Sequence, residues 1–206
     1  MYDYLVFDLD GVLVDVTEGY RNWIFDEIGD ELDYSFSDRQ KEMLWHGVGE
    51  GSREEMLRSW GFDDTRTFWD VYDEVECFEK RLEHTYAYED CSVLESLDQP
   101  MGIVTHSPGE LAERALEEAE LREHFDSIVS CSYDLGYKPD PSPIDKCLDD
   151  MACNGGDALM VGDSVSDVRG AWNAGLSAGH LDRMGHCIEA DYRFESLVEV
   201  AELTND

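Results

Sequence analysis

The stretch VFDLDGVLVD, residues 6–15, ends a short apolar run with two aspartates, Asp8 and Asp10, one residue apart. The apolar residues of this run are continuous rather than alternating, which indicates a strand buried on both faces. Similar runs follow at Met101–Thr105, Ser127–Ser130, Ala158–Val161 and, less regularly, Ser177–Leu181. Helical patterns over residues 108–120 and 143–151 separate the later strands. This alternation predicts an α/β fold with a parallel sheet and helices on both of its faces.

Residues 15–86, between the first and second strands, have a different pattern. Helical periods run through this stretch with no convincing strand, at Asp15–Ile28, Ser37–Trp45, Ser52–Trp60 and Thr65–Glu83. The stretch is too long for a crossover between adjacent strands. We therefore expect two domains: a core of residues 1–14 and 87–206, and an all-helical domain of residues 15–86 inserted beside the C-terminal edge of the sheet.

The composition is strongly acidic. The 206 residues include 49 Asp and Glu against 15 Lys and Arg, which gives a formal net charge of −34 spread over the whole chain. This charge argues against nucleic acid as a partner and is typical of a halophilic protein, because molar salt screens the self-repulsion. We find no membrane-length apolar segment and no signal-peptide pattern, so we expect a cytoplasmic protein without a membrane partner. The six cysteines form no CxxC pair and are expected to be buried free thiols.

Polar residues gather at the predicted carboxyl ends of the strands, where open parallel sheets bind their ligands. These residues are Asp8 and Asp10 after the first strand, Thr105 at the end of the second, Lys138 before the helix over 143–151, and Asp163 and Asp167 after the fourth. Crowded carboxylates need a cation, and ligands that are all oxygen favour a hard divalent ion such as Mg²⁺. Asp8, Asp163 and a backbone carbonyl near Asp10 could supply its protein ligands.

The same residues fit chemistry on a phosphate ester. A carboxylate can attack phosphorus to give an aspartyl-phosphate, while its neighbour protonates the leaving oxygen and then activates water. Lys138 would neutralise charge on the phosphoryl oxygens, and Thr105 would donate its hydroxyl to one of them. Ser107 begins a capping-box pattern, SPGE, which predicts a helix N-terminus facing the phosphate. Each motif is common by itself in so acidic a chain, and it is their combination in this order that indicates a site.

The motifs FDLDGVLVD, VTHSP, YKPDPSP and VGDSVSDVRGAWNAG, in this order, resemble those of the haloacid dehalogenase superfamily of phosphohydrolases, in the subfamily with a helical cap inserted after the first motif. The resemblance covers essentially the whole chain and implies a Rossmann-like core, with the first strand central, and a cap that closes over the site. It also implies a role for each matching residue: Asp8 as nucleophile, Asp10 as general acid/base, Thr105 and Lys138 as the phosphate-binding pair, Asp8, Asp10 and Asp163 as the Mg²⁺ site, and Asp167 as a support for the metal site or for Lys138.

Substrate specificity is expected to depend on a few further residues. His106 stands where members of this superfamily usually carry asparagine, and with Ser107 it is a candidate substrate contact. In the helical domain Arg53 could hold a substrate anion, and further candidates are Tyr20, Arg21, Lys41 and His46. The leading hypothesis is a Mg²⁺-dependent phosphatase of a small phosphate ester, active as a monomer or homodimer. A phosphomutase with the same intermediate and a catalytically silent binding or regulatory protein are the alternatives.

Overall fold

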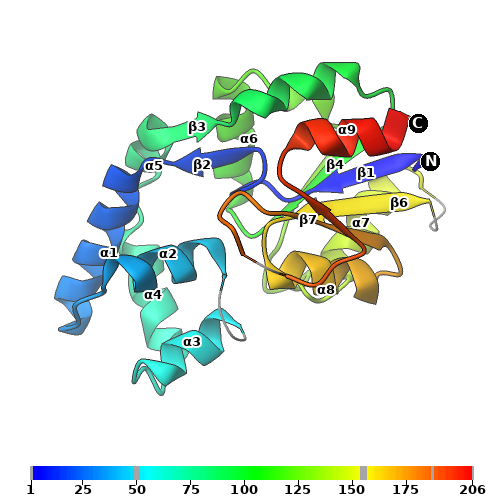
Figure 1. Ribbon diagram of the computed structural model, residues 1–206. Coiled ribbons are helices and arrows are strands. Elements are labelled where there is room, and N and C mark those ends of the chain that lie inside the picture. Colours follow the sequence, from blue (N-terminus) through cyan, green and yellow to red (C-terminus); the bar gives the residue numbers. More distant parts are fainter. Residues whose placement is uncertain (1, 49–51, 154–156, 187, 206) are drawn as a thin grey trace. The chain divides into compact units, whose positions relative to one another are not determined.

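The computed structural model describes residues 2–48, 52–153, 157–186 and 188–205. Its main feature is a six-stranded sheet in the order β5-β4-β1-β6-β7-β8, with all neighbouring strands parallel (Figure 1). The strands are β1 (Tyr4–Phe7), β4 (Met101–Thr105), β5 (Ser127–Ser130), β6 (Ala158–Gly162), β7 (Ser177–Leu181) and β8 (Tyr192–Phe194). The predicted parallel α/β fold is confirmed, and β1 lies inside the sheet between β4 and β6.

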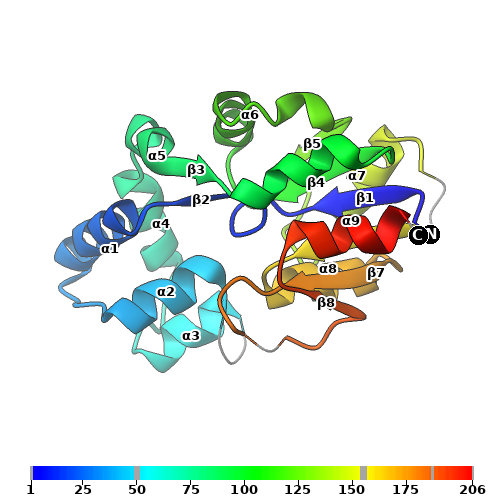
Figure 2. The ribbon, with the colours of Figure 1, turned by 45° about the horizontal axis from the view of Figure 1, so that its top comes forward.

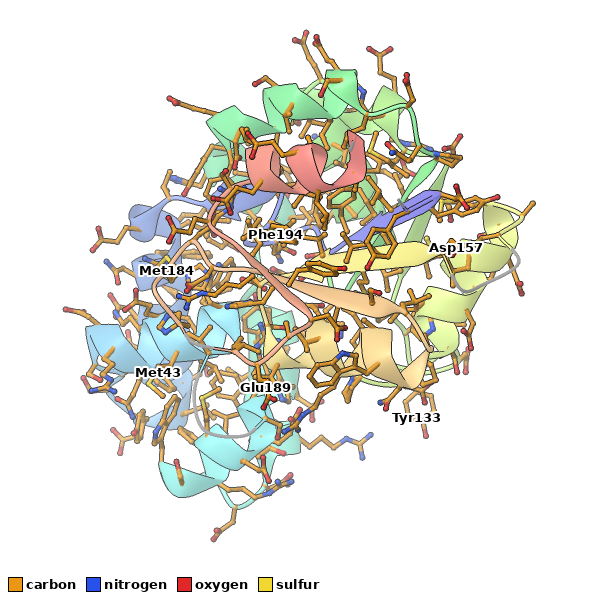
Figure 3. All side chains as sticks on the ribbon, turned by 45° about the vertical axis from the view of Figure 1, so that its right-hand side comes forward. Met43, Tyr133, Asp157, Met184, Glu189 and Phe194 are labelled. Atoms are coloured by element: carbon orange, nitrogen blue, oxygen red, sulfur yellow. The ribbon has the colours of Figure 1, made fainter. Side chains whose placement is uncertain are left out.

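Helices cover both faces of this sheet. Successive residues of a strand point to opposite sides, so the apolar residues of one strand contribute to two buried clusters. Leu5 and Phe7 of β1 join one buried cluster with α6 (Gly109–Glu118), α9 (Leu197–Asn205) and the 3₁₀ helix η1 (Glu89–Ser96). Val6 joins a second cluster with α7 (Ser142–Asp150) and α8 (Val165–Asn173). A short 3₁₀ helix, η2 (Arg122–His124), follows α6. In Figure 3 the buried ring of Phe194 lies within the core, whereas Tyr133 lies at the surface, 92% exposed.

The chain divides into two compact units, residues 1–15 with 87–206, and residues 16–86. The sequence-based boundary lies one residue earlier, at Asp15. The second unit consists of α1 (Glu18–Leu32), α2 (Asp38–His46), α3 (Arg53–Ser59), α4 (Thr65–Val75) and α5 (Phe78–His84). Within it α1 packs against α2, α4 and α5 (Figure 2) around a core rich in aromatic rings.

Two predictions for this stretch are wrong. The expected absence of strands is contradicted by β2 (Val14–Val16) and β3 (Thr85–Ala87), which pair as a two-stranded sheet where the chain passes between the units. The single helix expected over Thr65–Glu83 is broken at Glu76 and Cys77, which have extended backbone. The break allows a buried ion pair between Glu76 and Arg81 at 2.5 Å, a five-residue spacing that does not bring side chains together on one helix face.

Two further features of the described residues are the length of the helices and the state of the cysteines. None of the helices that the structure describes is long and apolar enough to cross a membrane. Five cysteines are free thiols, and Cys91, Cys131 and Cys147 among them are buried. The sixth, Cys187, lies outside the described residues.

Candidate active site

The sequence-predicted site residues of the core unit lie at the carboxyl ends of three strands. Asp8 directly follows β1, and its backbone N–H donates to the Val161 carbonyl of β6 at 2.9 Å. Thr105 is the last residue of β4 and has no exposed surface. Asp163 follows β6. The parallel register therefore aligns the three strand ends, as ligand sites in such sheets require.

Lys138 connects two of these strand ends. Its ammonium donates to Asp8 Oδ1 at 2.8 Å and to the Val104 carbonyl of β4 at 2.7 Å, and it lies 2.7 Å from Asp167 Oδ1. An ammonium group has three N–H donors; two bind Asp8 and the Val104 carbonyl, and the charge is shared with Asp167 as an ion pair. With a residue exposure of 4%, the lysine is held at one position beside Asp8.

Asp167 is fixed by the start of α8. Its Oδ2 accepts from the hydroxyl of Ser164 at 2.6 Å and from the Ser164 backbone N–H at 3.0 Å, which forms a capping box. A Cβ added at Gly162 would lie 2.1 Å from Asp167 Cβ, so only glycine allows this close approach. Since Oδ1 faces Lys138 and Oδ2 caps the helix, Asp167 is a partner of the lysine.

A possible cation site lies among three carboxylates. Asp8, Asp163 and Asp167 each place one carboxylate oxygen within 4.8 Å of the other two. A Cβ at Gly11, which has φ of +80°, would be 2.0 Å from Asp163 Oδ2, so the Asp163 carboxylate rests directly against this glycine. Because both Asp167 oxygens have the partners given above, Asp8 and Asp163 are the side chains suited to bind a metal ion.

The electrostatics of the site reflect this crowding. Burial and the negative charge of Asp167 raise the pKa of Asp8 well above its usual range, and Lys138 opposes the shift only in part. Burial disfavours the charged forms of Lys138 and Asp167 as well. Their mutual attraction outweighs it, so the pKa of Lys138 is raised and the pKa of Asp167 is lowered. The lysine and Asp167 are therefore an ion pair at neutral pH.

Asp10 and Ser107 form a second part of the site. The Ser107 hydroxyl donates to Asp10 Oδ2 at 2.5 Å, and the Ser107 backbone N–H donates to Thr105 Oγ1 at 3.0 Å. The predicted capping box is wrong, because Pro108 is the N-cap of α6 and no side chain caps it. The hydroxyl expected at the helix start is instead bonded to Asp10.

The candidates His106 and Arg53 lie in different surroundings. The His106 ring meets that of Tyr137 edge to face, with centroids 5.7 Å apart. Arg53 belongs to the helical unit, where it donates to the carbonyls of Leu44 and Trp45 at 2.8 Å. It thereby caps the end of α2, and its role in substrate binding stays a prediction.

Three groups that shape the site were not predicted from the sequence. The Val104 carbonyl that holds Lys138 gives no side-chain signal at all. Ser164 could have been found from its spacing to Asp167, because a polar residue three positions before an acid at a helix start is a capping signature. Gly11 directly follows DLD, but only the structure shows that Asp163 requires it.

Comparison with known proteins identifies the family. The model for haloacid dehalogenase-like hydrolases matches residues 5–179. The pyrophosphatase PpaX of Bacillus cereus strain B4264 is 30% identical over 189 residues, which cover 83% of this chain and 79% of that protein. A Lactobacillus plantarum protein provisionally assigned as a phosphoglycolate phosphatase superposes with a TM-score of 0.82 at 23% identity, over 98% of this chain and 99% of its own.

A third relative carries a metal ion. The YfnB protein of Bacillus subtilis, whose crystal structure contains magnesium, superposes with a TM-score of 0.67 at 19% identity, over 100% of this chain and 99% of its own. The predicted family and the predicted hydrolase class are thereby confirmed. As the order of its motifs predicts, this chain belongs to the haloacid dehalogenase-like hydrolase family.

Proposed function

We propose that this chain is a Mg²⁺-dependent phosphatase that hydrolyses a small phosphate ester through a phosphorylated Asp8. The observation that carries the proposal is the setting of the Asp8 carboxylate. It lies 2.8 Å from the buried Lys138 ammonium and within 4.8 Å of an Asp163 oxygen. A nucleophile between a fixed cation and a metal-binding carboxylate suits attack on a phosphoryl group, because positioning and charge neutralisation provide most of the catalysis.

The residues present fit a bound Mg²⁺. Asp8 and Asp163 offer carboxylate oxygens, which Mg²⁺ prefers, and Mg²⁺ sites commonly use only one or two carboxylates and keep several waters. The close approach of Asp163 to Gly11 leaves its carboxylate at the end of β1. When bound there, Mg²⁺ would withdraw charge from the phosphoryl oxygens and favour the ionised form of Asp8.

In the first step an Asp8 oxygen attacks phosphorus. An O–P bond to Asp8 forms while the ester P–O bond breaks, and the leaving oxygen keeps the bonding electron pair. Asp10 gives its proton to that oxygen, so the alcohol departs neutral. Lys138 and the Thr105 hydroxyl stabilise the negative charge of the transferring group.

The second step releases phosphate. Asp10, now a carboxylate, takes a proton from a water molecule whose oxygen attacks phosphorus, and the P–O bond to Asp8 breaks. Asp8 regains its carboxylate, and Asp10 is protonated again for the next cycle. Phosphate is the only other product, so the two steps together amount to hydrolysis.

Release of inorganic phosphate from a panel of phosphate esters, to which the anhydride pyrophosphate is added, tests this proposal. We expect turnover with MgCl₂ in molar KCl, abolition by excess EDTA, and loss in Asp8→Asn. The panel includes pyrophosphate, phosphoglycolate and sugar phosphates. The first two are suggested by the relatives described above. No release from any member would refute the proposal, and transfer of phosphate to another hydroxyl of the substrate would point to a mutase.

A further inference from the structure

The contact between Ser107 and Asp10 is unusually close. The Ser107 hydroxyl reaches Asp10 Oδ2 at 2.5 Å, within the range of strong hydrogen bonds to ionised acceptors. The serine is 5% exposed. A buried hydroxyl that donates to a carboxylate restrains the rotation of that carboxylate, because turning it away breaks the hydrogen bond.

The same serine orders Thr105. The Ser107 N–H donates to Thr105 Oγ1 at 3.0 Å, so the threonine oxygen is already an acceptor on that side. The hydrogen of the threonine hydroxyl must then point elsewhere, and it can donate to a phosphoryl oxygen. One residue therefore contacts both the group assigned to phosphate binding and the group assigned to proton transfer.

We infer that Ser107 is a positioning residue for Asp10, an inference that rests on the proposed function. Because Oδ2 accepts from Ser107, the Asp10 carboxyl is held in one orientation while it gives and takes its proton. Loss of the serine hydroxyl would let the Asp10 carboxyl rotate away from the leaving oxygen. The effect falls on substrates whose leaving group needs a proton and spares those whose leaving group departs as a stable anion.

Two aryl phosphates of similar shape test this inference. Phenyl phosphate loses a weakly acidic phenol, whereas 2,4-dinitrophenyl phosphate loses a strongly acidic one that needs no proton. The kinetic readout is kcat/KM, which covers only the steps up to departure of the phenol and so excludes hydrolysis of phosphorylated Asp8. For Ser107→Ala we expect a fall of about ten- to a hundredfold on phenyl phosphate and less than about threefold on the dinitrophenyl ester.

Conservative variants of Ser107 show whether a loss of activity comes from the missing hydroxyl or from a disturbed structure. Ser107→Thr keeps the hydroxyl and should restore most of the activity on phenyl phosphate, while Ser107→Cys keeps the shape with a weak donor and should resemble alanine. Ser130→Ala is the matched control. Ser130 pairs with Thr105 in the β4–β5 register, and its hydroxyl has no hydrogen-bond partner among the described residues. It should leave both rates unchanged.

The outcomes separate the inference from the proposed function. Equal losses on both aryl esters, or no loss on either, would overturn the positioning role while the phosphatase stands. Should Ser107→Ala fail to fold, the same comparison is made with Ser107→Cys. If the unaltered protein hydrolyses neither aryl ester nor any ester of the panel, the proposed function fails and the inference fails with it.

Discussion

Replacing Lys138 by methionine removes a cation that contacts both Asp8 and Asp167 and keeps a side chain of similar length. The lysine side chain is 1% exposed, that of Asp167 is 1% exposed, and that of Asp8 is 13% exposed. Breaking a buried ion pair on one side costs about 3–5 kcal/mol, because the remaining charge stays desolvated. We expect the free energy of unfolding at pH 7.5, without Mg²⁺, to fall by this amount.

The loss should depend on pH in a defined direction. In the unaltered protein the pKa of Asp167 is lowered, so its stabilising contribution is complete above the unfolded pKa of about 3.9 and is lost only as the pH falls through the folded value. Without Lys138 the pKa of Asp8, already raised by burial, rises further, and the pKa of the buried Asp167 is expected to rise above that of the unfolded chain. Protonation then relieves the repulsion, and the deficit shrinks as the pH falls, by at most about 1.4 kcal/mol per pH unit for each carboxylate.

Urea unfolding followed by circular dichroism at pH 7.5 and pH 5.0, in KCl with EDTA, measures this difference. Lys146→Met is the matched control, because Lys146 pairs with Asp150 on the surface and its side chain is 51% exposed. Its loss should stay below about 0.5 kcal/mol at both pH values. A loss in Lys138→Met that is no larger than that of the control, or that is equal at the two pH values, would refute the reasoning.

Three further predictions concern the metal site, the surface charge and the thiols. Gly11→Ala would push a Cβ against Asp163, and we expect at least about tenfold weaker activation by Mg²⁺ in an activity titration. Gly175→Ala, with a φ of +77° and nothing within 4 Å, is the control for backbone strain alone. The net charge of −34 predicts that raising KCl from 0.2 to 2 M increases the melting temperature by more than about 5 °C in calorimetry, and a decrease would contradict the halophilic interpretation. Burial raises the pKa of Cys91 and Cys147 to about 12, so a disulfide reagent at pH 8 should label them only after urea unfolding; rapid labelling of the folded protein would contradict their burial.

The sequence predicts the strands that have continuous apolar runs. The bounds of β1, β4 and β5 follow from it directly, because strands covered on both faces have apolar residues inside the run. The run of β7 is less regular, since His180 lies inside it. The strand β8 has only three residues, and Arg193 interrupts its apolar pattern, so no run marks it. The break between α4 and α5 has no glycine or proline either. The ion pair that it allows between Glu76 and Arg81 is not encoded by a local pattern.

The candidate site also has a part that the sequence predicts and a part that it does not. Acids and a lysine placed at strand ends are visible in the sequence, because the period of strands and helices fixes where each strand stops. The partners of each side chain are not visible. Ser107 has the sequence signature of a helix cap, yet its hydroxyl bonds to Asp10, 97 residues earlier in the chain. A hydroxyl can cap a helix or bind a distant carboxylate equally well, and only the fold determines which acceptor is near.

Asp167 shows why the role of an acid in this chain depends on its partners more than on its charge. Oδ2 completes the capping box of α8, and Oδ1 faces Lys138 at 2.7 Å. The positive end of the helix dipole favours a carboxylate at this position independently of the lysine. The carboxylate that orients Lys138 is therefore held by a helix start and by the close approach of Gly162, not by a surface loop. Asp167 is one of 49 acidic residues. It can hold a lysine at a fixed distance from Asp8 because it is 1% exposed, hydrogen-bonded through Oδ2 and ion-paired through Oδ1.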